Sequence, residues 1–350
     1  MQKIILILFL AFLIPFASFA SEKTNPFGIL TFLPWNEAWN NYMYKNETEI
    51  DKAVSLLKDL GVSTIRVDFS WNNIEREQGV YDFKRLDYII SVCQKNDIEV
   101  LGVIGYSPSW TGKQWNEPPP GTKPLLKFIT TAVKRYPYIK YWEFWNEPDS
   151  PTYWQPQDDM KAYVSLLKAV YPAIKSANPQ SAVLLGGLTR DGFYAFKSVL
   201  RLGGGDYFDI VNFHPFVDPN QPDGFHIVGG VLELFRKELQ KYNLNKKIWL
   251  TEVGCPGREN TENCSWWLGP CQNEQQQAEF LKKAYACFLT QKDVDKIFWA
   301  FFQDTNNHFN SGVDSFGLIR ADFSKKPAYY EYKKIIDEWK NKSTTDQSRQ

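Results

Sequence analysis

Apolar segments alternate with amphipathic segments along the chain from about residue 27 to residue 340. The apolar segments are short and nearly continuous, as in strands that are buried on both faces of a sheet. The pattern predicts eight strands, which are Phe27 to Leu33, Thr64 to Phe69, Glu99 to Ile104, Tyr141 to Glu147, Val183 to Leu188, Ile210 to Phe213, Ile248 to Glu252 and Ile297 to Phe302.

The amphipathic segments carry apolar residues three and four positions apart, which is the spacing of one helix face. They predict a helix after each strand, at about Glu49 to Leu60, Leu86 to Cys93, Leu125 to Arg135, Met160 to Ile174, Phe193 to Leu202, Val231 to Tyr242, Glu274 to Leu289 and Tyr332 to Trp339. Thr48 is expected to cap the first of these helices and Gly61 to end it.

Strict alternation of apolar strands and helices predicts a single-domain (β/α)8 TIM barrel over residues 21–340. An open, doubly wound parallel sheet also alternates in this way. That alternative is less favoured because no glycine-rich phosphate-binding motif follows the first strand.

The two ends of the chain differ from this core. Residues 1–20 combine Lys3 with an apolar run from Ile4 to Phe16 and end in small residues, which is typical of a secretory signal peptide. The apolar run is too short to span a bilayer and contains Pro15, which argues against a membrane anchor. We therefore expect a secreted protein, extracellular or periplasmic, with no stable membrane association. The polar residues 341–350 are expected to form a disordered tail.

Composition narrows the choice of partner. Over 350 residues the 40 basic and 40 acidic side chains give a net charge of zero, so no electrostatic footprint for nucleic acid is present. Aromatic residues make up 16% of the chain and include 13 tryptophans, whose rings can stack on the C–H faces of sugars. A neutral carbohydrate is the expected partner.

Three of the five cysteines, Cys255, Cys264 and Cys271, lie in one predicted loop. Export allows a disulfide among these three, and the pairing is left open. A zinc site is the alternative, but no C-x-x-C spacing occurs and the histidines lie elsewhere in the sequence. No metal and no other cofactor is therefore expected.

Two of the predicted strands end on a glutamate. Pro148 cannot donate to a sheet, so the aromatic strand that precedes it should end at about Glu147, while a second apolar strand ends at Glu252. The carboxyl ends of barrel strands surround one mouth, so both carboxylates are expected to project into the same space. Two carboxylates at one site are the minimum equipment for cleaving a glycosidic bond.

The other predicted strand ends are polar or aromatic, and they carry Arg66, Asp68, Tyr106, Asn146, His214 and Trp299. Arg66 is expected to keep Glu252 ionised and His214 to orient it through a hydrogen bond. Asp68 is expected to be the partner of Arg66, because a buried guanidinium needs one.

These motifs resemble those of the retaining glycoside hydrolases of clan A. Asn146-Glu147-Pro148 is similar to the acid/base motif at the fourth strand of that clan, and Thr251-Glu252-Val253-Gly254 to the nucleophile motif at the seventh. Residues 65–83 look like the second strand and loop of families 39, 42 and 5. Residues 105–110 and 213–216 look most like family 39 and its relatives, with families 5 and 42 next.

The resemblance implies a double displacement with Glu252 as the nucleophile and Glu147 as the acid/base. It also implies that Asn146 binds the 2-hydroxyl of the sugar and that Trp299 lies beneath the reacting sugar as a platform. Tyr106 and Trp110 are expected to contact substrate, with packing in the barrel as the alternative for Trp110.

The length leaves no room for the accessory β domain that many exo-acting members of family 39 carry, which favours an endo-acting enzyme on a poly- or oligosaccharide. An exo-acting enzyme like a β-xylosidase or β-glucosidase is the alternative. A catalytically silent carbohydrate-binding barrel would need neither glutamate. A metal-dependent hydrolase would need clustered ligands at the strand ends, and only His214 qualifies.

Overall fold

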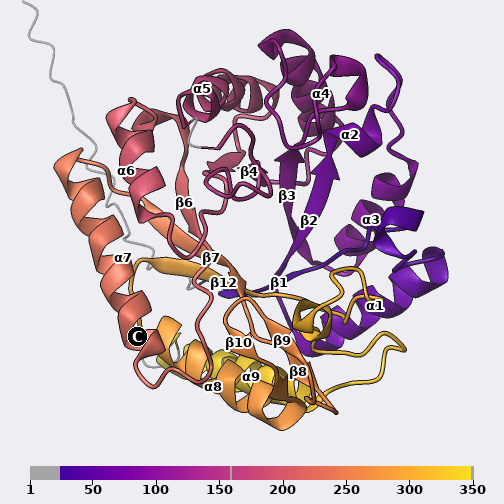
Figure 1. Cartoon of the computed structure of the whole chain (residues 1–350), viewed down its shortest axis with the longest axis vertical. Coiled ribbons are helices and arrows are strands. Elements are labelled where there is room, and N and C mark those ends of the chain that lie inside the picture. Colours follow the sequence, from indigo (N-terminus) through magenta and orange to yellow (C-terminus); the bar gives the residue numbers. More distant parts are fainter. Residues whose placement is uncertain (1–23, 158–159, 348–350) are drawn as a thin grey trace, which may run out of the picture.

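In the computed structural model, which describes residues 24–157 and 160–347, eight parallel strands close into a barrel (Figure 1). The predicted signal peptide lies outside the described residues. Around the barrel the strands follow the order β1, β12, β7, β6, β5, β4, β3 and β2. Their bounds are β1 (Phe27–Leu30), β2 (Thr64–Ser70), β3 (Glu99–Gly105), β4 (Tyr141–Phe144), β5 (Ala182–Leu184), β6 (Ile210–Phe213), β7 (Lys247–Val253) and β12 (Val294–Trp299). The predicted (β/α)8 barrel is confirmed.

Helices surround the barrel on the outside (Figure 1). They are α1 (Glu47–Leu60), α2 (Trp71–Ile74), α3 (Lys84–Lys95), α4 (Thr122–Arg135), α5 (Met160–Ala177), α6 (Phe193–Arg201), α7 (Gly224–Lys241), α8 (Glu274–Phe288) and α9 (Pro327–Gln347). Short 3-10 turns, η1 (Ala38–Asn40), η2 (Ser109–Thr111), η3 (Gly205–Tyr207) and η4 (Gly312–Ser315), lie in the loops. Within the described ranges, no helix has the length and apolar character needed to cross a membrane.

Several helix boundaries differ from the prediction, including those of α1, α7 and α9. Helix α1 begins at Glu47 because the side chain of Asn46, and not that of Thr48, accepts the free backbone N–H of Glu49 at 3.0 Å. Helix α7 begins at Gly224, before the predicted start at Val231. Helix α9 continues to Gln347, so residues 341–347 are helical and do not form the expected disordered tail; no proline or glycine is present there to stop the helix.

Strand β4 ends at Phe144 and not at Glu147. Trp145 and Glu147 both have positive φ angles, of 70° and 42°, so regular strand geometry is interrupted at both residues. Asn146 still forms an isolated bridge with Gly187, beyond the end of β5. Backbone strain of this kind is often concentrated at functional sites.

The barrel interior has an apolar floor and a polar mouth. Five buried side chains from five strands form a separate cluster, Leu101, Leu184, Ile210, Trp249 and Phe298. The larger core lies between the sheet and the helices. Nearer the carboxyl ends of the strands the buried side chains include polar and charged ones, Arg66, Glu143, Asn212, His214 and Thr251. Functional sites of this fold lie at the carboxyl ends of the strands, so these side chains are the candidates for chemistry.

Two glycine substitutions should change stability in opposite directions. A Cβ at Gly28 on β1 would lie 2.5 Å from the ring of Phe298, so Gly28→Ala should lower the free energy of unfolding by about 1–3 kcal/mol. A Cβ at Gly230, exposed on α7, meets nothing within 4 Å, so Gly230→Ala should raise it by about 0.5–1 kcal/mol. Denaturant unfolding measures both, and a shift of the same sign in the two variants would contradict this packing.

Candidate active site

Glu147, His214 and Glu252 meet at the mouth of the barrel. Glu147 follows β4, His214 follows β6 and Glu252 lies near the end of β7. One carboxylate oxygen of each glutamate and one ring nitrogen of His214 all lie within 4.8 Å of one another. The glutamate side chains are 14–15% exposed, whereas that of His214 is fully buried. Two carboxylates therefore share one partly accessible space.

Arg66 is the buried centre of this arrangement. Its Nε and Nη2 atoms donate to the two carboxylate oxygens of Glu143, each at 2.7 Å. Nη1 donates to Oε1 of Glu252 at 2.7 Å, and Nη2 also donates to Oδ1 of Asn146 at 2.7 Å. The guanidinium thus forms a bidentate ion pair with one carboxylate and a single contact with another.

The partner of Arg66 is therefore Glu143, and the expectation for Asp68 is wrong. Asp68 accepts a hydrogen bond from the indole nitrogen of Trp35 at 3.3 Å instead. Sequence reasoning missed Glu143 as a site residue. The sequence does contain a signal, because Glu143 is a charged residue in an otherwise aromatic strand. It lies two positions from Tyr141, so both side chains point to the same face of the sheet, which is the barrel interior.

His214 contacts Glu147 more closely than Glu252, which corrects the expected hydrogen bond. Nδ1 lies 2.9 Å from Oε1 of Glu147 and 3.8 Å from Oε1 of Glu252. Nε2 lies 2.9 Å from the hydroxyl oxygen of Thr251, which donates to Asn212. The hydroxyl oxygen therefore accepts a hydrogen bond from the N–H at Nε2. Nδ1 then carries no hydrogen and accepts a hydrogen bond from the protonated carboxyl group of Glu147.

The surroundings affect the pKa values of the two glutamates differently. Burial, together with the charge of Asp149, raises the pKa of Glu147 to about 8, so this carboxyl holds its proton at neutral pH. Burial also raises the pKa of Glu252, but the positive charge of Arg66 at 2.7 Å acts in the opposite direction. Burial lowers the pKa of His214, which favours the neutral imidazole required by the bonds just described.

Asn146, Tyr106 and Trp110 lie around this centre in different ways. The amide oxygen of Asn146 is used by Arg66, which leaves its NH2 group for other partners. The ring of Tyr106, 9% exposed, packs edge-on against Trp145 at 5.3 Å. Trp110 donates its indole N–H to the backbone oxygen of Glu75 at 2.7 Å, so it joins the loops after β2 and β3.

Trp299 does not lie beneath the mouth, and the expectation of a sugar platform there is wrong. Its side chain is fully buried, its indole nitrogen donates to the backbone oxygen of Phe316 at 2.9 Å, and its ring approaches Phe280 of α8. Side chains alternate along a strand, and the preceding Phe298 belongs to the interior cluster. Trp299 therefore faces the helices.

The loop cysteines pair as Cys264 with Cys271, and Cys255 remains a buried free thiol. Glu147, His214 and Glu252 are also of the types that bind metals. Arg66 already provides a positive charge at 2.7 Å from Oε1 of Glu252, however, and would repel a cation at that oxygen. The arrangement fits proton transfer and nucleophilic attack better than metal ligation.

A closed parallel barrel with two glutamates facing each other at its mouth defines the class of TIM-barrel glycoside hydrolases. The sequence model described as cellulase (glycosyl hydrolase family 5) matches residues 20–304. The chain belongs to this family. Membership of clan A is thereby confirmed, although the sequence motifs pointed first to family 39 and only then to family 5.

Solved structures of related proteins share the fold. A family 39 glycoside hydrolase from Bacteroides cellulosilyticus WH2 has a TM-score of 0.68 at 24% identity, over 90% of this chain and 64% of that one. Xylanase 10B from Thermotoga petrophila RKU-1 has a TM-score of 0.65 at 19% identity, over 90% of this chain and 94% of that one.

One curated protein, the beta-galactosidase BgaA of Clostridium cellulovorans, is 32% identical over 80 residues. The match spans 23% of this chain and only 11% of that protein. It therefore covers a short segment of a much longer relative.

The pH dependence of activity should report the two glutamates. If Glu147 must be protonated, kcat/KM should fall as the pH rises through about 8, and the acid limb should follow deprotonation of Glu252. Glu147→Gln cannot lose a proton, so its residual activity on a substrate with a good leaving group should no longer decline in the basic range. A basic limb that persists unchanged in Glu147→Gln would assign it to another group.

Proposed function

We propose that this protein is a secreted retaining glycosidase that cleaves β-glycosidic bonds in a poly- or oligosaccharide, with Glu252 as the nucleophile and Glu147 as the acid/base. The observation that carries the proposal is the pair of carboxylates within 4.8 Å, of which one contacts Arg66 and the other has a pKa of about 8. Retaining glycosidases need carboxyl groups about 5–5.5 Å apart, and inverting ones need more room for a water molecule.

In the first step a carboxylate oxygen of Glu252 attacks the anomeric carbon. The bond from that carbon to the glycosidic oxygen breaks, and Glu147 gives its proton to the departing oxygen. In the second step Glu147 takes a proton from water, whose oxygen attacks the same carbon and releases Glu252. His214 would assist because Nδ1 lies 2.9 Å from the carboxyl group that gains and loses the proton.

Two features support an endo-acting enzyme. The barrel rim carries exposed indoles on loops from different sides, Trp39, Trp115 and Trp267, and a long glycan can contact several such rings at once. A structurally similar protein is a xylanase. No metal or other cofactor takes part in the proposed reaction.

Secretion is supported by the signal-like residues 1–20 and by the disulfide between Cys264 and Cys271. Disulfides are rare in cytosolic proteins, which are kept reduced, and common in exported ones. The proposed location is extracellular or periplasmic, after removal of the signal peptide.

Glu147→Ala tests the acid/base assignment. The variant should lose most turnover on natural glycans, by about 10²–10⁴-fold, yet retain the first step on aryl glycosides whose leaving group needs no proton. Azide should then restore turnover, because it attacks the glycosyl-enzyme without general-base help. The measurement is steady-state kinetics on both substrate types with and without azide.

Glu338→Ala, a change at an exposed glutamate on α9, is the matched control and should behave like the parent protein. Equal losses on both substrate types in Glu147→Ala, with no effect of azide, would contradict the assigned role.

A further inference from the structure

The loop between β7 and α8 is built as a closed hairpin that presents one tryptophan. It contains two short pairings, β9 (Ser265–Trp266) with β10 (Gly269–Pro270) and β8 (Gly257–Arg258) with β11 (Gln272–Asn273). The Cys264–Cys271 disulfide closes the first pairing at its base. Trp267 lies in the turn and is 56% exposed, which makes it the most exposed indole among the described residues.

Aromatic side chains from neighbouring loops support this indole. Its ring lies 5.1 Å from that of Phe216, at an angle of 89°, and 5.7 Å from that of Phe316. Phe216 comes two residues after His214, and the backbone oxygen of Phe316 holds Trp299. The exposed ring is therefore packed against the loops that follow β6 and β12.

The disulfide also packs directly on the loop that follows β12. A Cβ at Gly312, the first residue of η4, would lie 2.5 Å from Sγ of Cys271 and 3.3 Å from Sγ of Cys264. Cys271 donates its backbone N–H to the oxygen of Cys264 at 3.0 Å. The sulfur bridge is thus wedged between its own hairpin and η4, and only glycine allows this approach.

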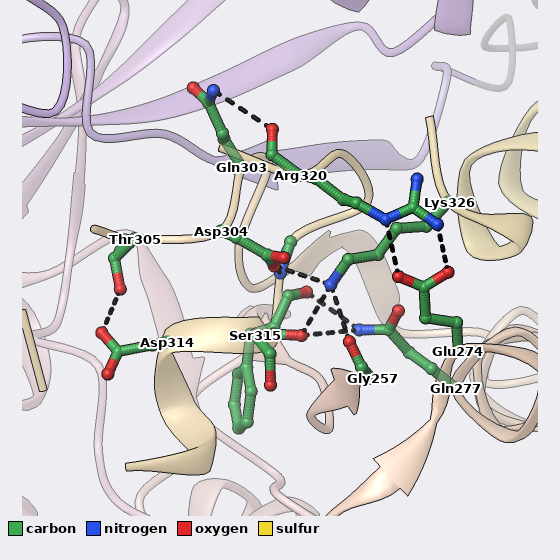
Figure 2. A network of polar contacts seen from close by, with 12 residues as sticks. Gly257, Glu274, Gln277, Gln303, Asp304, Thr305, Asp314, Ser315, Arg320 and Lys326 are labelled. Atoms are coloured by element: carbon green, nitrogen blue, oxygen red, sulfur yellow. Dashed lines mark hydrogen bonds and ion pairs between the residues drawn. The ribbon is translucent and has the colours of Figure 1, made fainter. Parts of the chain in front are cut away.

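Two buried side chains fix the base of the same loop, as Figure 2 shows. Nζ of Lys326 donates to the backbone oxygens of Gly257 and Ser315, at 2.8 and 3.0 Å, and to Asp304 at 2.7 Å. All three ammonium protons are thereby used. Lys326 is fully buried, so breaking these bonds would leave an unpaired charge.

Gln277 completes the network from α8. Its side-chain nitrogen lies within hydrogen-bond distance of the backbone oxygens of Cys255, Ser315 and Phe316, at 3.0, 3.3 and 3.2 Å. Figure 2 shows Gln277 beside Ser315. The network therefore joins the start of the β7 loop to the residue whose ring supports Trp267. A rigid hairpin loses little conformational entropy when a ligand binds to it.

We propose that Trp267 forms an outer sugar-binding subsite, stacking on a pyranose ring of a glycan that extends from the Glu147 and Glu252 centre, and that the disulfide-closed hairpin holds the indole in place. The inference rests on the proposed function and adds that the substrate is long enough to reach beyond the reacting sugar. Trp267 is a binding residue, and the cysteines, Lys326 and Gln277 are positioning residues.

The test compares a long substrate with a short one. The probes are xylo-, cello- and manno-oligosaccharides from disaccharide to hexasaccharide, together with the corresponding aryl glycosides. Trp267→Ala should lower the ratio of kcat/KM for the hexasaccharide over that for the aryl glycoside by about tenfold, mainly through KM. Trp267→Phe should retain most of the ratio, because it keeps an aromatic face.

Two further variants separate binding from structure. The double variant Cys264→Ser with Cys271→Ser should lower the same ratio, because the hairpin is released. Tyr242→Ala removes an exposed aromatic ring at the C-terminal end of α7, before β7 begins and so at the opposite end of the barrel, and should leave the ratio unchanged.

Binding to the inactive Glu252→Gln protein, measured by calorimetry, provides a readout that does not depend on turnover. Adding Trp267→Ala to that protein should weaken binding of the hexasaccharide more than that of the disaccharide. Equal binding of every length with and without Trp267 would overturn the subsite while leaving the proposed function intact. A parent protein that cleaves none of these substrates would instead contradict the proposed function, and the subsite with it.

Discussion

The buried ion pair between Arg66 and Glu143 is the interaction on which the rest of the barrel mouth depends. Two N–H groups of Arg66 bind both oxygens of Glu143, and its other contacts reach Asn146 and Glu252. One guanidinium thus joins β2, β4 and β7. Two charges removed from water are costly, and the bidentate geometry with further hydrogen bonds is what offsets that cost.

The same ion pair also positions the backbone around Glu147. Oε1 of Glu143 accepts the backbone N–H of Gly187 at 3.0 Å, and the oxygen of Gly187 accepts the N–H of Glu147 at 2.9 Å. A Cβ at Gly187 would lie only 2.1 Å from Nε2 of His214. The absence of a side chain there lets the imidazole pass close to the chain and reach Glu147. Glu252 thus contacts a cation directly, whereas Glu147 contacts a neutral imidazole.

Much of the fold could be predicted from the sequence, because the apolar periodicity of eight strands and their helices is a strong, repeated signal. The site glutamates were predictable for the same reason, since each lies at the end of an apolar stretch of the sequence. Trp299 could not be placed, because the register of β12 against β7 shifts between Ile297 and Trp299, and the sequence gives no sign of such an irregularity. The role of Glu143 could not be predicted because it depends on a contact between β2 and β4. The pairing of Cys264 with Cys271 could not be predicted either, because it depends on a hairpin that has no apolar periodicity.

The central claim is that Glu252 forms a covalent bond with the sugar. It is tested most directly by the intact mass of the protein after exposure to a panel of 2-fluoro glycosides, followed by peptide mapping. The account predicts one added sugar on the peptide that contains Glu252, and none in Glu252→Gln. A sugar bound to a different residue, or turnover of these reagents with inversion at the anomeric carbon, would contradict it.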